Sequence, residues 1–82
     1  MEDDSGDWVI SYNGELYNHD KLRQELIKKF SVTFRGRSDT EVVLYAIKYF
    51  GIDEFLRKAD GMFAFAVFDK ARGDFYLARD RV

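Results

Sequence analysis

The sequence contains no cysteine, no proline and only one histidine. A chain without cysteine forms no disulfide, holds no thiolate metal ligand and supplies no thiol nucleophile, which fits a reducing compartment. A single histidine is also too little for a typical zinc site, so we expect no bound metal. Glycine occurs six times and only where turns are predicted, so neither a GxGxxG motif nor a phosphate-binding Walker loop is present.

The charged residues also lack an excess of one sign. Thirteen basic and fifteen acidic residues are interspersed and leave a formal net charge of −2. Domains that bind nucleic acid carry clustered positive charge, so we expect no nucleic-acid partner. The longest apolar run, 62–68, is too short to cross a bilayer, and the acidic N-terminus is the reverse of a signal peptide. These features predict a cytoplasmic protein without a membrane segment.

Aromatic residues, in contrast, are abundant. Hydrophobic residues make up 46% of the 82 positions and aromatic residues 17%, which predicts a packed core rather than disorder. So many rings in so short a chain suggest self-association through exposed aromatic faces. A predicted strand begins directly behind an acidic turn, and the sequence ends directly after another strand. We therefore expect part of a larger domain, truncated at both ends.

The spacing of apolar residues predicts an α+β fold. Strands are expected at 8–12, 31–35, 62–68 and 74–79, and helices at 19–29, 38–50 and 53–59. Asn18 is expected to cap the first helix, Ser38 and Glu41 to form a capping box on the second, and Gly51 to end it. The strand 62–68 is apolar on both faces, so we expect it to be central and covered on both sides. A hairpin at 69–73 should join it to the last strand.

Asn13 and Gly14 stand between the first predicted strand and the first predicted helix. Asn-Gly pairs commonly form turns because both residues tolerate positive φ, so we expect a turn at this junction. The pair could also take part in binding or catalysis, since a ligand can approach a glycine N–H closely and the asparagine amide adds a second donor. Together the two groups could stabilise a developing oxyanion. The residue types alone leave both interpretations open.

Three other positions have two interpretations each. His19 is interpreted as a solvated residue at a helix start rather than as a catalytic base. Asp39 is interpreted as a first-turn carboxylate that the helix dipole stabilises, with a functional role as the alternative. The segment Arg79-Asp80-Arg81 is either a solvated strand end or a contact for a phosphate or a partner.

Four motifs stand in the same order as in a known family. They are Tyr12-Asn13-Gly14-Glu15-Leu16-Tyr17-Asn18-His19 with Leu22-Arg23, Arg37-Ser38-Asp39-Thr40-Glu41-Val42, Gly61-Met62-Phe63-Ala64-Phe65-Ala66-Val67-Phe68-Asp69, and Ala78-Arg79-Asp80-Arg81. On these motifs the chain resembles the glutaminase domain of class II glutamine amidotransferases, and within that family it is most similar to glutamine-hydrolysing asparagine synthetase. The resemblance covers nearly the whole chain from Trp8 onward. Residues 1–82 are therefore expected to be part of such a domain.

The resemblance implies an N-terminal-nucleophile hydrolase fold, in which two antiparallel sheets lie between outer layers of helices. The residues alone predict antiparallel strands on both sides of two central helices. That arrangement is compatible with part of this αββα sandwich.

The resemblance also implies roles for four residues. The Asn13 side chain and the Gly14 N–H correspond to the oxyanion hole, Glu15 to a residue that helps to hold glutamine, and Asp39 to the carboxylate that pairs with the α-ammonium of the substrate. In the family an N-terminal cysteine attacks the glutamine amide, its own α-amine serves as the base, and the thioester is hydrolysed. Ammonia then passes to a second domain, which in asparagine synthetase forms aspartyl-adenylate with ATP and Mg²⁺.

The chain departs from the family in three respects. It has no cysteine, no counterpart of the arginine that binds the substrate carboxylate, and no synthetase domain, so no cofactor is expected in this chain itself. We therefore expect a fragment of a glutaminase domain that is inactive alone. One alternative is a non-catalytic binding or assembly module with a degenerate amidotransferase fold. Another is a sensor in which Glu15 and Asp39 hold an amino-acid ammonium with millimolar affinity at best.

Overall fold

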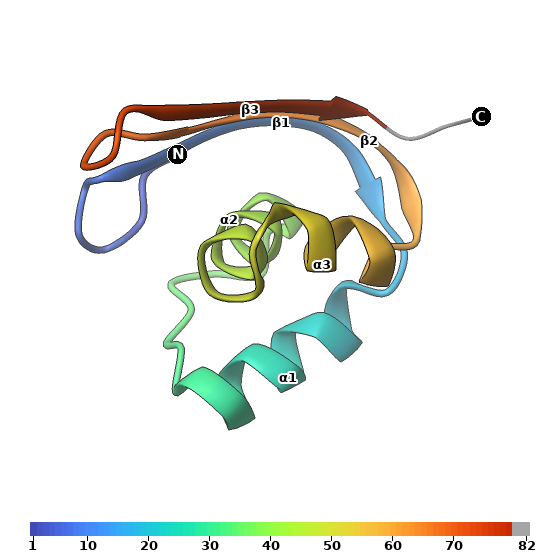
Figure 1. The fold of residues 1–82 in the computed structure, drawn as a ribbon. Helices are drawn as coiled ribbons and strands as arrows, with labels where there is room; N and C mark the ends of the chain where they lie inside the picture. Colours follow the sequence, from blue (N-terminus) through green and yellow to red (C-terminus); the bar gives the residue numbers. More distant parts are fainter. Residues whose placement is uncertain (80–82) are drawn as a thin grey trace.

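The computed structural model describes residues 1–79 as one antiparallel sheet with helices on one side of it (Figure 1). In chain order the elements are β1 (Trp8–Leu16), α1 (His19–Phe30), α2 (Asp39–Phe50), α3 (Ile52–Lys58), β2 (Gly61–Asp69) and β3 (Asp74–Arg79). The predicted α+β class is confirmed. None of these helices is long and apolar enough to cross a membrane.

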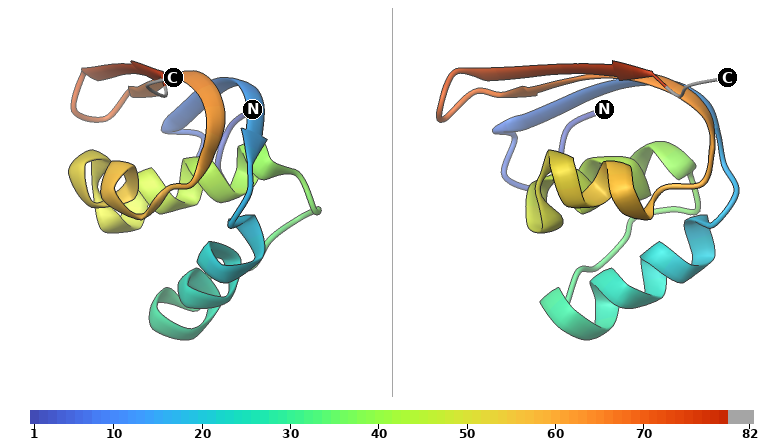
Figure 2. Two further views of the ribbon diagram at one scale, coloured as in Figure 1. Left: turned by 90° about the vertical axis from the view of Figure 1, so that its right-hand side faces the viewer. Right: turned by 45° about the vertical axis from the view of Figure 1, so that its right-hand side comes forward.

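The helices form two layers beneath the sheet. α2 and α3 lie directly under it, and α1 lies on the far side of α2 (Figures 1 and 2). The opposite face of the sheet carries neither a helix nor a second sheet within residues 1–79. The prediction of strands on both sides of the helices is therefore wrong for the described chain, which forms a single sheet.

The strands run in the order β1-β2-β3, each antiparallel to its neighbour. The predicted hairpin at 69–73 is confirmed, and the Asp69 carboxylate accepts hydrogen bonds from the N–H groups of Ala71 and Arg72 within it. β2 is the central strand, as predicted. The register places Asn13 opposite Ala64, and Ala64 opposite Arg79, so these side chains share one face of the sheet.

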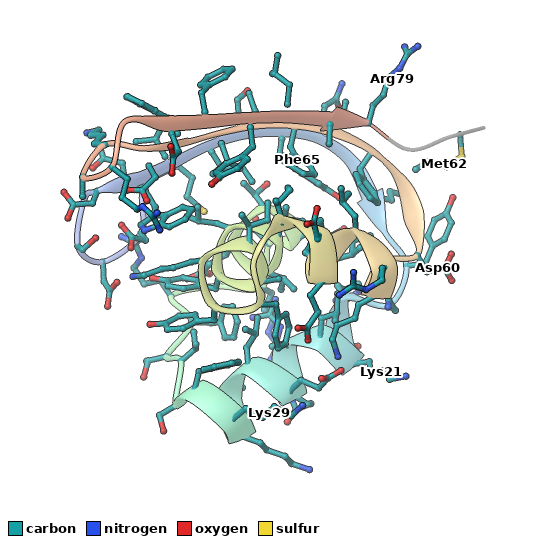
Figure 3. The ribbon with its side chains drawn as sticks, in the orientation of Figure 1. Lys21, Lys29, Asp60, Met62, Phe65 and Arg79 are labelled. Carbon is teal, nitrogen blue, oxygen red and sulfur yellow. The ribbon has the colours of Figure 1, made fainter. Side chains whose placement is uncertain are left out.

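β2 is covered on one face only. Phe63, Phe65 and Val67 are buried toward the helices, whereas Met62 and Phe68 on the other face are exposed. Figure 3 shows Phe65 pointing to the helices and Arg79 pointing away from them. The prediction that β2 is covered on both sides is therefore wrong for the described residues. We call the uncovered side the outer face; by strand alternation it carries Val9, Ser11, Asn13, Glu15, Met62, Ala64, Ala66, Phe68, Phe75, Leu77 and Arg79.

β1 extends to Leu16, past the predicted turn at Asn13 and Gly14. The turn prediction is wrong, because both residues pair with β2 and the chain turns only at 17–18. Gly14 has a φ of 125°, and a Cβ atom there would lie 2.1 Å from the backbone oxygen of Met62. The glycine therefore allows two strands to approach closely, a role that a local turn rule does not detect.

The core lies between the inner face of the sheet and α2. This helix is buried from Glu41 to Ile47 because it contacts β1, α1 and α3. Leu22 and Leu26 of α1 pack against it at the predicted helical spacing. The ring of Phe55, from α3, contacts the rings of Phe63 and Phe65 beneath the sheet.

Residues 31–35 form no strand, contrary to the prediction. Ser31 ends α1 in the left-handed conformation, with a φ of 57°. The N–H groups of Arg35 and Gly36 then donate to the buried carboxylate of Glu41, at 2.7 and 3.0 Å. A side chain thus supplies the acceptors that a neighbouring strand would otherwise have offered.

Asn18 precedes α1 as predicted, but its side chain does not cap the helix. The Nδ2 group donates to the backbone oxygen of Lys58 at 2.8 Å, and Oδ1 accepts from the N–H of Asp60 at 3.0 Å. The side chain therefore ties the turn after β1 to the segment that enters β2. The prediction of a capping role is wrong because a distant backbone segment competes for the same amide.

The predicted ends of α2 are confirmed in part. The Ser38 hydroxyl accepts the N–H of Thr40 at 3.0 Å and so caps the helix. Glu41 does not complete a capping box, because its carboxylate is engaged with Arg35 and Gly36. At the other end Gly51 stops the helix with a φ of 89°.

Candidate functional site

The predicted site residues lie on or beside the end of β1, and we call the edge of this strand that does not pair with β2 the free edge. In an antiparallel strand the N–H and C=O of one residue point to the same side, and successive residues alternate. The N–H of Ile10 donates to the backbone oxygen of Met1, and that of Leu16 donates to the carboxylate of Asp39. The N–H groups of the even-numbered residues of β1 therefore point away from β2. By this alternation the N–H of Gly14 also faces the free edge. No strand of residues 1–79 pairs with it there.

Asp39 reaches the free edge from the first turn of α2. Its Oδ2 accepts the N–H of Leu16 at 2.9 Å, across 23 positions of sequence. Its Oδ1 accepts no hydrogen bond from residues 1–79 and can therefore receive one from a ligand. The first-turn position was predicted correctly, but the contact that fixes the end of β1 was not.

Asn13 and Glu15 flank Gly14 on the outer face, and both are exposed. The Asn13 amide forms no hydrogen bond with residues 1–79 and borders a shallow hollow of about 610 Å³. Apolar residues of the neighbouring strands, among them Ala64 and Leu77, line much of this hollow. An amide donor and a backbone N–H thus lie on adjacent residues at the margin of an open apolar surface.

Glu15 and Asp39 line a common cavity of about 320 Å³ at the end of β1, together with Leu16, Tyr17 and His19. Two carboxylates on one small cavity favour a cationic group, and an ammonium fits this charge. The structure therefore brings Glu15 and Asp39 together, next in sequence and space to the donors of Asn13 and Gly14. Asn13 borders the separate hollow on the outer face, and Gly14 lies between Asn13 and Glu15 in the strand.

Tyr12 is a candidate that the sequence did not indicate. Its hydroxyl is buried and has no hydrogen-bond partner within residues 1–79. Burial, and after it the negative charges of Asp39 and Glu15, raise the pKa of Tyr12 to about 12. The hydroxyl therefore remains neutral near the two carboxylates. No sequence signal distinguishes this residue from an ordinary core tyrosine, which also stacks on a neighbouring ring as Tyr12 does on Phe63.

His19 begins α1 with 37% of its side chain exposed, which agrees with the predicted helix-start residue. Its Nδ1 lies 3.2 Å from Oδ1 of Asp20 but does not meet the geometry of a hydrogen bond. The ring also borders the cavity of Glu15 and Asp39, a position that the sequence did not predict.

Two further predictions concern groups at the margins of the site. No cluster of histidine, aspartate and glutamate that could hold a metal ion occurs among residues 1–79. Arg79 ends β3 exposed on the outer face, while Asp80 and Arg81 lie outside the described residues. Glu41 was missed as a positioning residue, because the sequence predicted only a capping role for it, whereas its carboxylate holds the N–H groups of Arg35 and Gly36.

Comparison with known proteins assigns the family. A family model described as a glutamine amidotransferase domain matches residues 1–82. The probable glutamine-hydrolysing asparagine synthetase of Dictyostelium discoideum is 41% identical over 74 residues, which are 90% of this chain and 13% of that protein. Glutamine-hydrolysing asparagine synthetase 1 of Bacillus subtilis is 44% identical over 73 residues, 89% of this chain and 11% of that protein.

The glutamine-hydrolysing asparagine synthetase of Homo sapiens is more distant, at 35% identity over 71 residues, which are 87% of this chain and 12% of that protein. The chain therefore spans only between 11% and 13% of the length of these three relatives. The family model covers every strand and helix of the described residues. On these matches, the chain belongs to the family of glutamine amidotransferase domains.

Proposed function

We propose that this chain carries the oxyanion-holding and ammonium-binding part of a glutaminase site. The relatives are named glutamine-hydrolysing asparagine synthetases. We extend that activity to the whole protein, which would hydrolyse glutamine to glutamate and ammonia in the cytoplasm. A synthetase region beyond these 82 residues would use the ammonia to amidate aspartate with ATP and Mg²⁺.

The observation that carries the proposal is the free edge of β1. The N–H of Gly14 faces this edge and has no strand partner there among residues 1–79. The side-chain amide of the neighbouring Asn13 likewise forms no hydrogen bond with these residues. Asp39 stands at the same edge, held by Leu16, and shares a cavity with Glu15. Donors for an anion on Asn13 and Gly14 thus lie next in sequence to Glu15, which shares a cavity with Asp39, and this supports the binding of an amino-acid amide.

Each of these groups has a role in amide hydrolysis. Attack on the glutamine carboxamide places negative charge on its carbonyl oxygen, and the fixed donors of Asn13 and Gly14 stabilise that charge. Glu15 and Asp39 attract the α-ammonium and so position the carboxamide at the free edge. Because the sequence has no cysteine, the nucleophile would come from outside residues 1–82, and this chain alone would not turn over glutamine.

The outer face supports the finer fold assignment. Phe75 and Leu77 on it are 60% and 73% exposed, and Met62 on β2 is 52% exposed. A second sheet packed about 10 Å away would cover such a face. We therefore propose that β1, β2 and β3 belong to one sheet of an αββα N-terminal-nucleophile hydrolase sandwich.

Replacement of Asn13 by alanine tests the catalytic role in a protein that joins this chain to a nucleophile-bearing segment. We expect kcat for glutamine hydrolysis to fall about 10²–10³-fold, because one oxyanion donor is lost. Ser11→Ala is the matched control, since Ser11 lies two positions earlier on the same exposed face of β1. Turnover near that of the wild type in Asn13→Ala would overturn the proposal.

The absence of cysteine also favours a second candidate, a non-catalytic binding or assembly module. In its sensor form, Glu15 and Asp39 would hold the ammonium of an amino acid without any turnover. Calorimetry on the chain tests this form, for which we expect a Kd for glutamine no tighter than about 1 mM. Glutamine hydrolysis by the isolated chain would contradict both candidates, since neither supplies a nucleophile.

A further inference from the structure

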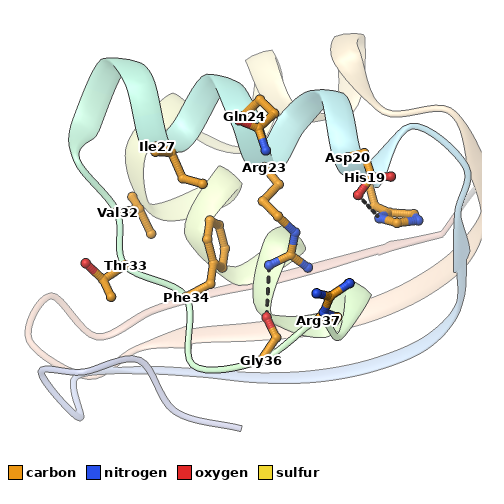
Figure 4. A pocket seen from close by; sticks show the side chains of 10 residues that line it. All are labelled: His19, Asp20, Arg23, Gln24, Ile27, Val32, Thr33, Phe34, Gly36 and Arg37. Carbon is orange, nitrogen blue, oxygen red and sulfur yellow. Dashed lines mark hydrogen bonds and ion pairs between the residues drawn. The ribbon is translucent and has the colours of Figure 1, made fainter.

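A third cavity lies between α1 and the segment that leads to α2. It has a volume of about 670 Å³, and Arg23, Gln24 and Ile27 of the helix line one side of it, with residues 32–34, 36 and 37 on the other (Figure 4). We call it the basic groove. The function proposed above does not use it, apart from His19, which borders both cavities.

One end of the basic groove presents two guanidinium groups. Figure 4 shows Arg23 and Arg37 at the same end, with His19 beside them. Neither arginine forms an ion pair with a carboxylate of residues 1–79. Asp20 is the one carboxylate that lines the groove, and its Oδ1 lies 3.2 Å from Nδ1 of His19.

Arg23 is held in place before any ligand arrives. Its Nη1 donates to the backbone oxygen of Gly36 at 2.9 Å, and its guanidinium carbon lies 4.6 Å from the centre of the Phe34 ring. An arginine has five N–H donors, so most of the fork remains available to an oxygen ligand. A guanidinium fixed on an aromatic face loses little conformational entropy when it binds an anion.

Apolar side chains also line the basic groove, on α1 and on the facing segment. Val32 is buried, Phe34 is half-buried, and Ile27 is 40% exposed, so aliphatic and aromatic surface continues from the arginines. An inorganic anion would use only the guanidinium end. The groove therefore matches a molecule that joins a charged head to an apolar body.

We propose that the basic groove binds a small organic anion, with a phosphate or carboxylate head on Arg23 and Arg37 and an apolar, preferably aromatic, body against Val32 and Phe34. Both heads offer paired oxygens that a guanidinium fork recognises. The basic groove shares only His19 with the cavity of Glu15 and Asp39, and its proposed contacts use none of the four residues of the proposed glutaminase site. The two proposals can therefore fail independently.

Titration of the chain with phenyl phosphate, followed by the backbone amide signals of Thr33, Gly36 and Arg37, tests this proposal. We expect saturable shifts confined to the groove, and Arg37→Gln to weaken binding about tenfold through loss of one charge-assisted contact. Arg57→Gln is the matched control, because Arg57 is an exposed arginine on α3 and does not line the groove. It removes the same charge and should leave the affinity unchanged.

Three smaller probes separate the parts of the ligand. Benzyl alcohol lacks the charge and inorganic phosphate lacks the ring, so we expect both to bind more weakly than phenyl phosphate. Benzoate in place of phenyl phosphate identifies the preferred head. The proposal is overturned if phenyl phosphate moves no groove signal, if Arg57→Gln weakens binding as much as Arg37→Gln, or if inorganic phosphate binds as tightly as phenyl phosphate.

Discussion

At the residue scale, one carboxylate serves two parts of the molecule. Asp39 begins α2, and its Oδ2 holds the N–H of Leu16 at the end of β1. Asp39 also lines the cavity that Glu15 borders, and its other oxygen accepts no hydrogen bond from residues 1–79. The structural role and the proposed ligand-binding role therefore rest on different properties, an oxygen acceptor and a negative charge.

The two roles of Asp39 separate on substitution. Asp39→Asn keeps an oxygen acceptor for Leu16 but removes the charge, so we expect the free energy of unfolding to change little. In an active protein that contains this chain, the KM for glutamine should rise about 10- to 100-fold, since hydrogen bonds to charged groups contribute about 1.5–3 kcal/mol. Steady-state kinetics and urea denaturation measure both effects.

Asp39→Ala is the comparison for that measurement, because it loses the acceptor as well and should also unfold more easily. If the asparagine variant lost as much stability as the alanine variant and kept the wild-type KM, Asp39 would be a structural residue only.

At the scale of elements, two glycines allow the paired strands β1 and β2 to approach each other closely. A Cβ atom at Gly61 would lie 2.2 Å from the backbone oxygen of Glu15, and one at Gly14 would lie 2.1 Å from that of Met62. Each glycine thus faces the backbone of the opposite strand. This close approach lies at the carboxyl end of β1, where Leu16 meets Asp39 at the start of α2.

Gly61→Ala is expected to lower the free energy of unfolding by about 3 kcal/mol, because a backbone oxygen must move to admit the methyl group. Gly73→Ala in the hairpin is the control; its φ is 73°, but no atom lies within 4 Å of the added carbon, so only about 1 kcal/mol of backbone strain is expected. Chemical denaturation of both variants measures the difference. Equal losses of unfolding free energy in the two variants would show that the close approach of β1 and β2 is not what requires a glycine at position 61.

The segment before β1 is tied to α2 by a buried ion pair. The Asp3 carboxylate lies 2.6 Å from Nζ of Lys48 and is buried. Burial alone raises the pKa of the Asp3 carboxyl, but hydrogen bonds from Lys48, Ser5 and the Trp8 N–H outweigh it and hold the pKa below its usual value of 3.8. The stabilisation is therefore present above pH 3.8 and is lost as the pH falls through the lower folded-state pKa.

Asp3→Asn should accordingly cost about 2 kcal/mol of unfolding free energy near neutral pH, the contribution of hydrogen bonds to a charged group. The gap between the wild type and the variant should narrow as the pH falls below about 4. Thermal or urea unfolding as a function of pH checks this. A gap that stayed constant through the acid range would show that the carboxylate charge contributes nothing.

The elements that the sequence predicted correctly depend on neighbours within a few positions. Leu22 and Leu26 define their helix by spacing alone, and Asp69 holds its own hairpin. The elements that it predicted wrongly depend on groups outside the segment for which the prediction was made. Gly14 is a strand residue because of Met62, and Glu41 supplies the bonds that keep 31–36 out of a sheet.

At the scale of the whole molecule, the helices cover only half of the sheet. Phe68 and Phe75 contact each other on the outer face, with ring centres 6.3 Å apart, and Leu77 beside them is 73% exposed. Apolar surface of this kind associates in water unless another layer covers it. The proposed second sheet would be that layer in the whole protein.

For the 82-residue chain alone, we expect concentration-dependent self-association and binding of the dye ANS through the outer face. Phe75→Ser combined with Leu77→Ser should reduce both, as measured by sedimentation velocity and dye fluorescence. Ile27→Ser is the control, since this exposed residue lies on α1, away from the sheet. A monodisperse, dye-silent wild-type chain would contradict the expectation.

The arrangement of the candidate site could not be predicted from the sequence alone. The resemblance proposed roles for Asn13, Gly14, Glu15 and Asp39, while the contact that joins Asp39 to β1 spans 23 positions and depends on how α2 packs. Tyr12 carried no signal, because its unpaired hydroxyl follows from the surrounding fold. The sequence thus indicated which residue types the candidate site contains, but only the structure shows how they are arranged.

The hydrogen bond from the Leu16 N–H to Asp39 also allows the opening of the candidate site to be measured by hydrogen exchange. In heavy water the Leu16 amide can exchange its proton only when the start of α2 separates from β1, so its exchange rate reports how often the site comes apart. The Gly14 amide, two positions earlier and open at the free edge, should exchange quickly until a ligand oxygen covers it. One amide therefore times the assembly of the site and the other its occupation.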